Sequence, residues 1–289
     1  MIVSIPTWAR ANHPYDSINR CLDTIKAAGF DYADAEFWEL QGDSSPLFSD
    51  SWETWANEVR EYADSIGIQF YQAHGLSVSG MQWDDPSYAP IAEKIWKMQY
   101  RAIEAARILG VKKFVVHPAN LAHASLYNAK KTKEYNIEFL SPYAEAAKKA
   151  SLTLAIENMV DFRGNRRRYC GGEPEELMEL VDAFNDDAIG ICVDTGHANL
   201  TGLHAGDLIR LYGKRVCALH INDNFGKGDD LHLAPFEGTV DWADVVLALR
   251  EIGYSDSFSY EISMPHKPKE TFGFWLKHYR DLASLILGE

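Results

Sequence analysis

The sequence has few cysteines and no apolar run long enough to cross a membrane. Its four cysteines, Cys21, Cys170, Cys192 and Cys217, show no CxxC spacing, and a chain of 289 residues does not need disulfide bonds to fold. No segment approaches the roughly 18 apolar residues of a membrane helix, and no charged leader with a long apolar core begins the chain. We therefore expect a soluble, cytoplasmic protein with reduced thiols.

Positive charge is also scarce. The chain has 28 Lys and Arg against 42 Asp and Glu, which gives a formal net charge of -14. Such a chain repels polyanions at long range, so a nucleic acid is a disfavoured partner. Two features would weaken this objection: carboxylates that bind metal ions, and a local basic patch acting within a Debye length.

Short β-branched or aromatic segments alternate with amphipathic segments along the whole chain. Eight strands are expected, near residues 2–5, 32–37, 68–74, 112–117, 152–157, 189–194, 216–221 and 258–263. Apolar residues recur with helical spacing over roughly 88–109, the clearest of the predicted helices. A doubly wound open sheet is disfavoured because no Gly-rich phosphate loop follows the first strand. The pattern predicts an α/β fold, a (β/α)8 TIM barrel that forms a single domain over residues 1–289.

Most of the predicted strands end in a side chain that can bind metal or carry a proton. These residues are Glu36, His74, His117, Glu157, Asp194, His220 and Glu261. In a (β/α) barrel such ends meet at one face, where active sites lie. One strand-end His or Glu would have an ordinary structural explanation, but carboxylates clustered in a partly buried mouth repel one another unless cations neutralise them. The predicted metal ligands are Glu157, Asp194, His220 and Glu261, with His74 and His117 as additional candidates.

The loops beyond the predicted sixth and seventh strands add three further candidate ligands. His197 follows Asp194 by three residues, and Asp230 and His232 alternate as two residues on one side of an extended segment would. Because of this alternation, Asp230 and His232 are a candidate ligand pair. The alternative is that the acidic residues of this loop are ordinary loop residues.

Aromatic and basic residues near the same face are candidates for substrate binding. Trp8 and Trp38 follow the first two strands and either cover the apolar face of a sugar or pack at the rim. Glu36 either binds hydroxyl groups or braces a loop. Arg163 belongs to a cluster with residues 166–168, which either holds a phosphate or carboxylate or forms a solvated loop or subunit contact.

The motifs QAHGL, VVHPAN, AIENM, CVDTGHA, LHINDN, DDLHL with FEGTVDW, and YEIS occur in this order. Together they resemble the xylose-isomerase-like TIM-barrel superfamily, which includes sugar and sugar-phosphate isomerases and epimerases as well as endonuclease IV. The resemblance runs from the third predicted strand to the eighth. It implies a metal-dependent enzyme, with two branches to choose between.

The sugar branch implies one divalent cation, Mn, Mg, Co or Zn, on the four predicted ligands. It implies that Glu157 and Glu261 move protons while the cation stabilises an enediolate, and that His197 binds a substrate oxygen. The partner would be a small sugar or sugar phosphate. Epimerisation and aldose–ketose isomerisation, the identity and phosphorylation of the sugar, and formation of a homo-oligomer all stay open.

The endonuclease branch implies three zinc ions and action on abasic DNA. Its nine ligand types are all present: His74, His117, Glu157, Asp194, His197, His220, Asp230, His232 and Glu261. The flanking residues differ, because Ala119 stands where a Gly is typical and Gly196 where endonucleases carry Cys. HLAPFEGTVDW is close to a run common among sugar-isomerase-like members, although Phe236 replaces the usual Gly. The leading interpretation is the sugar isomerase or epimerase, with a trinuclear zinc phosphodiesterase as the alternative and a non-catalytic binding protein as a third hypothesis.

Overall fold

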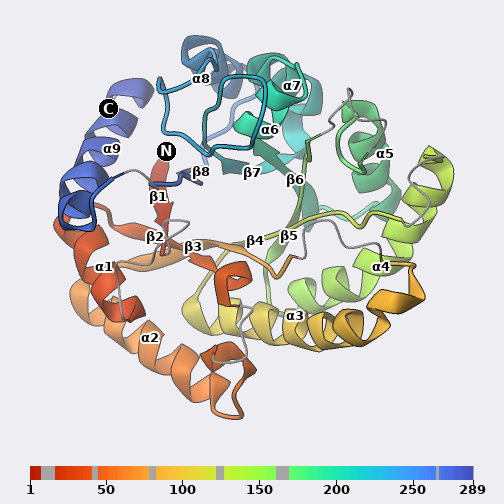
Figure 1. Cartoon of the computed structure of the whole chain (residues 1–289), viewed down its shortest axis with the longest axis horizontal. Coiled ribbons are helices and arrows are strands. Elements are labelled where there is room, and N and C mark those ends of the chain that lie inside the picture. The colour runs from red at the N-terminus through yellow and green to blue at the C-terminus, as the bar shows by residue number, and fades with distance from the viewer. Residues whose placement is uncertain are drawn as a thin grey trace.

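The computed structural model of the protein describes residues 1–7, 17–40, 45–77, 83–121, 127–160, 169–264 and 267–288. Within these ranges, short parallel strands form the centre of the molecule (Figure 1). The strands are β1 (Ile2–Pro6), β2 (Tyr32–Glu36), β3 (Gln69–His74), β4 (Lys113–Val116), β5 (Thr153–Glu157), β6 (Ile189–Asp194), β7 (Val216–His220) and β8 (Ser257–Ser259).

The strands form one sheet that closes on itself. Their order is β7-β6-β5-β4-β3-β2-β1-β8. The two edge strands meet through a parallel bridge between Ile221 and Tyr260, and the amide of Glu261 donates to the carbonyl of Ile221 at 3.0 Å. The predicted (β/α)8 TIM barrel is confirmed. Strand β8 ends at Ser259, short of the expected 258–263, and the next residue pairs with Ile221 as an isolated bridge.

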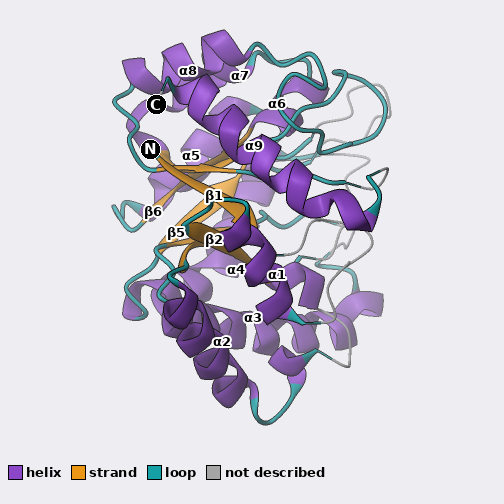
Figure 2. Ribbon diagram, turned by 90° about the vertical axis from the view of Figure 1, so that its left-hand side faces the viewer, coloured by secondary structure: helices purple, strands orange, loops and turns teal. Residues whose placement is uncertain are grey.

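Helices surround the strands on the outside. They are α1 (Ile18–Ala27), α2 (Trp52–Ile66), α3 (Ala89–Leu109), α4 (Ala129–Lys149), α5 (Pro174–Phe184), α6 (Thr195–Leu200), α7 (Ala205–Tyr212), α8 (Trp242–Glu251) and α9 (Phe272–Leu287). From the side, the strands lie between α7 and α8 above and α2 and α3 below (Figure 2). The helix expected at 88–109 is α3, which ends where Gly110 adopts a left-handed conformation with φ 84°.

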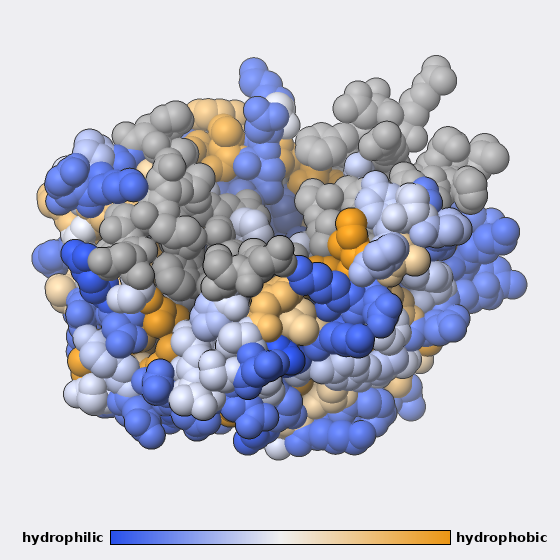
Figure 3. Space-filling view, turned by 60° about the horizontal axis from the view of Figure 1, so that its bottom comes forward, coloured by the Kyte–Doolittle hydropathy of each residue, from blue (hydrophilic) through white to orange (hydrophobic). Residues whose placement is uncertain are grey.

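The outer surface on the side of α2 and α3 is mostly hydrophilic, with small hydrophobic patches (Figure 3). The apolar faces of the helices are turned toward the strands, where residues such as Leu22, Ala63, Ile103 and Leu249 are fully buried. None of the described helices has the length and apolar composition that a membrane crossing requires.

The inside of the barrel explains why the polar residues converge. Side chains two positions apart on a strand point the same way. Small and polar side chains fill the interior, and across it Nε2 of Gln72 on β3 donates to the carbonyl of Leu219 on β7 at 3.1 Å. The interior residues are Asp34, Gln72, Val115, Ala155, Cys192, Ala218 and Ser259. Two residues after each of them comes one of the seven predicted strand-end residues, which therefore reaches the mouth.

Candidate functional site

The mouth of the barrel brings together the nine residues predicted as metal ligands. They fall into groups whose donor atoms all lie within 4.8 Å of one another. Three groups account for all nine: His74 with His117 and Glu157; Glu157 with Asp194, His220 and Glu261; and His197 with Asp230 and His232. Glu157 is shared by the first two groups. The sequence prediction of one converging site thus agrees with the geometry.

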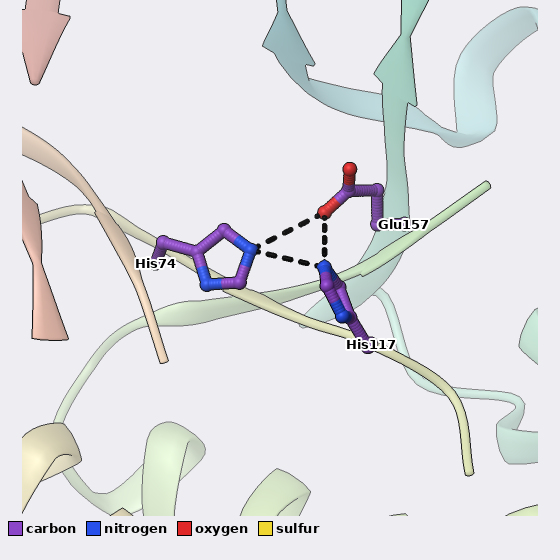
Figure 4. Close-up of side chains that lie close together, drawn as sticks. All are labelled: His74, His117 and Glu157. Atoms are coloured by element: carbon purple, nitrogen blue, oxygen red, sulfur yellow. Dashed lines mark hydrogen bonds and ion pairs between the residues drawn. The ribbon is translucent and has the colours of Figure 1, made fainter. Parts of the chain in front are cut away.

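The first group has the spacing of a coordination site. Nε2 of His74 and Nε2 of His117 are 3.1 Å apart, and they lie 3.5 and 3.2 Å from Oε2 of Glu157 (Figure 4). In a tetrahedral site with ligands about 2.0–2.1 Å from zinc, the ligand atoms are about 3.3 Å apart. The three atoms therefore fit one face of such a tetrahedron.

Neighbouring groups orient both imidazoles. Nδ1 of His74 lies 2.8 Å from the carbonyl oxygen of Gly75, which can only accept, so this nitrogen carries the proton. Nδ1 of His117 lies 2.8 Å from Oγ of Ser77. In the neutral form of His74, the lone pair of Nε2 consequently faces Glu157. Hydrogen bonds at Nδ1, on the side of the ring away from the metal, are usual for metal-binding histidines.

The second group places three carboxylates around one imidazole. Nδ1 of His220 is 3.1 Å from Oε1 of Glu157 and 3.2 Å from Oε2 of Glu261. Among the described residues, no hydrogen bond of good geometry reaches either carboxylate oxygen of Glu157 or Nδ1 of His220, although all are buried. Buried polar atoms normally have partners. A divalent cation bound by oxygen and nitrogen donors would supply the missing one, so these residues fit a metal ion.

Asp194 is held by its own local structure. It is the N-cap of α6, where Oδ1 accepts a hydrogen bond from the amide of His197 at 2.6 Å. Oδ2 accepts from Nδ2 of Asn222 at 2.6 Å, and the amide of Asp194 donates to Oδ1 of Asn158 at 2.7 Å. Sequence reasoning assigned no role to the two asparagines. A signal was present, since Asn158 directly follows Glu157 and Asn222 comes two residues after His220.

The third group lies on α6 and the loop between β7 and α8. Nε2 of His197 and Nε2 of His232 are 3.2 and 2.7 Å from Oδ2 of Asp230. Both Nδ1 atoms face backbone carbonyls, that of Asn158 at 2.8 Å for His197 and that of Glu261 at 2.9 Å for His232. His232 adopts a positive φ of 47°, which is uncommon outside glycine and aims its ring at the site. The predicted alternation of Asp230 and His232 does bring them together.

Asp223 shapes the loop that carries the third group. It is fully buried, and its carboxylate accepts from the amides of Asn224, Phe236 and Val240 and from the indole of Trp242, at 2.8 to 3.2 Å. In sequence this residue looked like an ordinary loop aspartate. Its hydrogen bonds fix the path of residues 224–242 near α6 and α8 (Figure 1).

The pKa values of the buried carboxyls show how strongly they depend on their neighbours. Burial alone would raise the pKa of Glu157, but the surrounding imidazoles, His220 and His117 foremost, hold it well below its usual range. Burial raises the pKa of Asp194 to about 7 and that of Glu36 to about 7. A cation at the mouth would favour the ionised form of all three.

Two of the remaining predicted substrate-binding residues lie near the mouth, and two lie outside the described residues. Glu36 is buried beside His74, and Trp38 donates from Nε1 to Oε2 of Glu36 at 2.5 Å, so the glutamate braces the indole. Trp38 lines the pocket at the mouth. Trp8 and Arg163, with the neighbouring arginines 166–168, lie outside the described residues.

Gly196 separates this site from the endonuclease sequence pattern. A Cβ atom at this position would lie 1.8 Å from Oδ1 of Asn222 and 2.9 Å from Nδ2 of Asn224. Asn222 is the residue that binds Asp194. A cysteine at 196 would therefore require a different arrangement behind the second metal group.

Residues 22–281 match the family described as the xylose isomerase-like TIM barrel, and the chain belongs to this family. An uncharacterised protein of Methanocaldococcus jannaschii is 32% identical over 216 residues, 72% of this chain and 71% of that protein. D-psicose 3-epimerase of Enterocloster bolteae is 24% identical over 268 residues, 91% of this chain and 81% of the epimerase. A crystal structure of the IOLI protein with a zinc atom superimposes with a TM-score of 0.73 at 18% identity, covering 99% of this chain and 98% of that one.

The family and its named relatives establish the class of this protein. It is an isomerase-type enzyme, which sets aside the hypothesis of a non-catalytic binding protein.

Proposed function

We propose that the protein is a metal-dependent isomerase or epimerase of a sugar or sugar phosphate. The observation that carries the proposal is the second group, in which Glu157 at the end of β5 and Glu261 just after β8 approach the same nitrogen of His220. The relationship to D-psicose 3-epimerase supports the choice of substrate class.

The geometry suggests a role for each residue. A divalent cation bound by Glu157, Asp194, His220 and Glu261 would polarise a carbonyl and stabilise negative charge on the two oxygens of an α-hydroxy carbonyl. Glu157 stays ionised among its imidazoles, as both a ligand and a base require. Glu261 arrives three strands away around the ring, so the two carboxylates can address opposite faces of the carbon between those oxygens.

Other residues complete the proposed substrate site. His197 is oriented by Asn158 to bind a substrate oxygen, and Trp38 would cover the apolar face of the sugar. Trp8 and Arg163 keep their proposed roles in substrate binding, with Arg163 holding a phosphate when one is present. Glu36 would act indirectly, by holding the indole of Trp38 in place.

Solvent-exchange measurements test the proposal. The protein loaded with Mn, Mg, Co or Zn in heavy water should catalyse deuterium incorporation at the carbon next to the carbonyl of at least one ketose, aldose or phosphate ester. Glu261→Gln should abolish the exchange, whereas Glu237→Gln, which removes a carboxylate away from the three groups, should keep it. Absence of exchange across a broad panel with every metal would overturn the proposal.

The three groups favour a second candidate, a trinuclear zinc phosphodiesterase acting on abasic DNA. Its specific support is that nine donors form three groups, two of which share Glu157. The isomerase-type class of the protein, its net charge of -14 and the contact at Gly196 all stand against it. Incision of an abasic duplex by the three-zinc protein would establish this candidate, and no incision with three zinc ions bound would remove it.

A further inference from the structure

The barrel closes at a seam between β7 and β8. In the described part of the chain, these two strands meet at the isolated bridge between Ile221 and Tyr260, whereas each other pair of neighbouring strands is joined by a register of several residue pairs. Two predicted metal ligands flank this seam. His220 ends β7 and Glu261 follows β8, and Nδ1 of His220 lies 3.2 Å from Oε2 of Glu261. The spacing of these ligands therefore depends on how the seam is held.

The side chain of Gln72 on β3 crosses the barrel interior and joins both sides of the seam. Its Nε2 donates to the carbonyl of Leu219 on β7 and to Oγ of Ser259 on β8, both at 3.1 Å. A carbonyl oxygen can only accept, so the amide nitrogen must face Leu219. Leu219 directly precedes His220, and Ser259 comes two residues before Glu261. One amide group thus ties the two strands next to the two ligands.

Asp34 on β2 fixes this amide from the other side. Its Oδ2 accepts a hydrogen bond from the hydroxyl of Ser259, whose single proton is thereby used, so the Ser259 oxygen accepts from Gln72. Oδ1 of Asp34 accepts from the backbone amide of Gln72 at 3.1 Å. Three strands therefore contribute to a closed ring of hydrogen bonds, which gives the amide one defined position.

The Gln72 side chain leaves one buried atom unsatisfied. Gln72 is 1% exposed, and among the described residues its Oε1 makes no hydrogen bond. A buried polar atom without a partner destabilises a fold, and a methionine of similar volume would not carry this carbonyl. The amide is therefore better explained by what its nitrogen holds than by the stability of the interior.

We propose that Gln72 is a positioning residue that keeps His220 and Glu261 at the spacing that the second metal group requires. Its side chain bonds to the backbone of β7 and to Ser259, so it acts on the ligands through their strands. Without the amide, the seam keeps the bridge at Ile221 but loses the tie at Leu219, and a divalent cation binds more weakly. This inference rests on the proposed function and identifies a residue on which that same site depends.

Titration calorimetry with Mn on the full chain tests the inference. The second group, with its three carboxylates, is the group that suits Mn best. Gln72→Met keeps the size of the side chain and removes both hydrogen bonds of Nε2. We expect it to weaken binding of the first Mn ion about tenfold or more, as loss of a group that orients a ligand does. Affinities are compared well below the melting temperature of each metal-free protein, so that unfolding does not contribute.

Ser259→Ala and Ser4→Ala are a matched pair that separates the seam from the general stability of the interior. The two serines are buried register partners on β8 and β1, and both hydroxyls donate to Oδ2 of Asp34. Among the described residues, only Ser259 also accepts from Gln72. We expect Ser259→Ala to weaken Mn binding about three- to tenfold and Ser4→Ala to change it by less than about twofold. This pair decides the matter where Gln72→Met does not fold.

Unchanged Mn affinity in Gln72→Met, or equal affinities in the two serine variants, would overturn the inference. Deuterium exchange from heavy water into sugars, measured on the same proteins, keeps the two proposals apart. Exchange by the wild type together with wild-type Mn affinity in Gln72→Met overturns only the role of Gln72. Weakened Mn binding in Gln72→Met, with no exchange by the wild type on any sugar, overturns only the isomerase and leaves Gln72 as a residue that shapes a metal site.

Discussion

Nε2 of His74 and Nε2 of His117 lie 3.1 Å apart and face the same carboxylate oxygen of Glu157. With the proton of His74 on Nδ1, its Nε2 presents a lone pair to Glu157, and only a proton on Nε2 of His117 could separate these acceptors without a cation. A metal ion would interact favourably with all three atoms at once.

The first prediction concerns the number of bound ions. Zinc-loaded protein should contain more than one zinc per chain by elemental analysis, and His117→Asn should lower the number by one because it removes a donor from the first group alone. His204→Asn changes an exposed histidine away from the mouth and should leave the number unchanged. A single ion in the wild type, unaffected by His117→Asn, would show that the first group binds no metal.

The second prediction concerns Asn158. Its Oδ1 accepts from the amide of Asp194 at 2.7 Å, and its Nδ2 donates to the carbonyl of Asp194 at 3.1 Å. Asn158→Ala should weaken binding of the first Mn ion by about 10–100-fold, because it releases the backbone that aims a ligand. Titration calorimetry gives the affinity. Asn136→Ala removes a similar pair of buried hydrogen bonds, to Ala119, and should lower thermal stability while changing Mn affinity by less than threefold. Equal loss of affinity in both variants would point to general destabilisation.

The third prediction concerns Asp34, inside the barrel. Burial raises its pKa to about 6. Hydrogen bonds from Ser259, Ser4 and the amide of Gln72 lower the pKa but do not cancel the effect of burial. The folded state therefore holds the proton more tightly than the unfolded state, whose pKa is about 3.9. The stability of the wild type should fall as the pH rises from about 4 to 6 and stay reduced above, by about 3 kcal/mol.

Asp34→Asn lacks this titration, so the difference in free energy of unfolding between the two metal-free proteins isolates it. Relative to Asp34→Asn, the free energy of unfolding of the wild type should fall between about pH 4 and 6, as measured by denaturant unfolding. A difference that does not change with pH would mean that the folded pKa of Asp34 is ordinary.

The fourth prediction concerns Phe236, which has a φ of 70° and is 62% exposed. A left-handed conformation costs a residue with a Cβ about 1–2 kcal/mol relative to glycine. Phe236→Ala keeps the strain and loses contact with Trp242, whereas Phe236→Gly removes the strain. Phe236→Gly should be about 1 kcal/mol more stable than Phe236→Ala in denaturant unfolding. Equal stability of the two variants would contradict the assigned strain.

Much of the architecture could be predicted because it depends on local periodicity. A period of two on each strand places Asp34 below Glu36 and Cys192 below Asp194, so the strand ends in the sequence already identify the mouth. The helical period of Ile95 and its neighbours likewise predicts α3. Metal binding by the converging residues stays a prediction, which rests on the requirement that their carboxylates be neutralised.

Other features depend on contacts that no local pattern encodes. The proton position on His74 is set by the carbonyl of Gly75, and the site of Asp194 by an asparagine 28 residues away. The contact between Trp83, which precedes α3, and Phe139 of α4 also joins segments far apart in the sequence. The motifs contain His74, Asp194 and the asparagine, but only their placement in three dimensions shows what each one contacts.

Asp223 holds the loop after β7 by hydrogen bonds that involve neither Asp230 nor His232. Much of the loop's path is therefore held independently of the side chains of Asp230 and His232. Substitutions at those two positions could add or remove an ion-binding site without rebuilding the backbone. We expect such a barrel to gain or lose a third ion during evolution more readily than a barrel whose loop is held by the ligands alone.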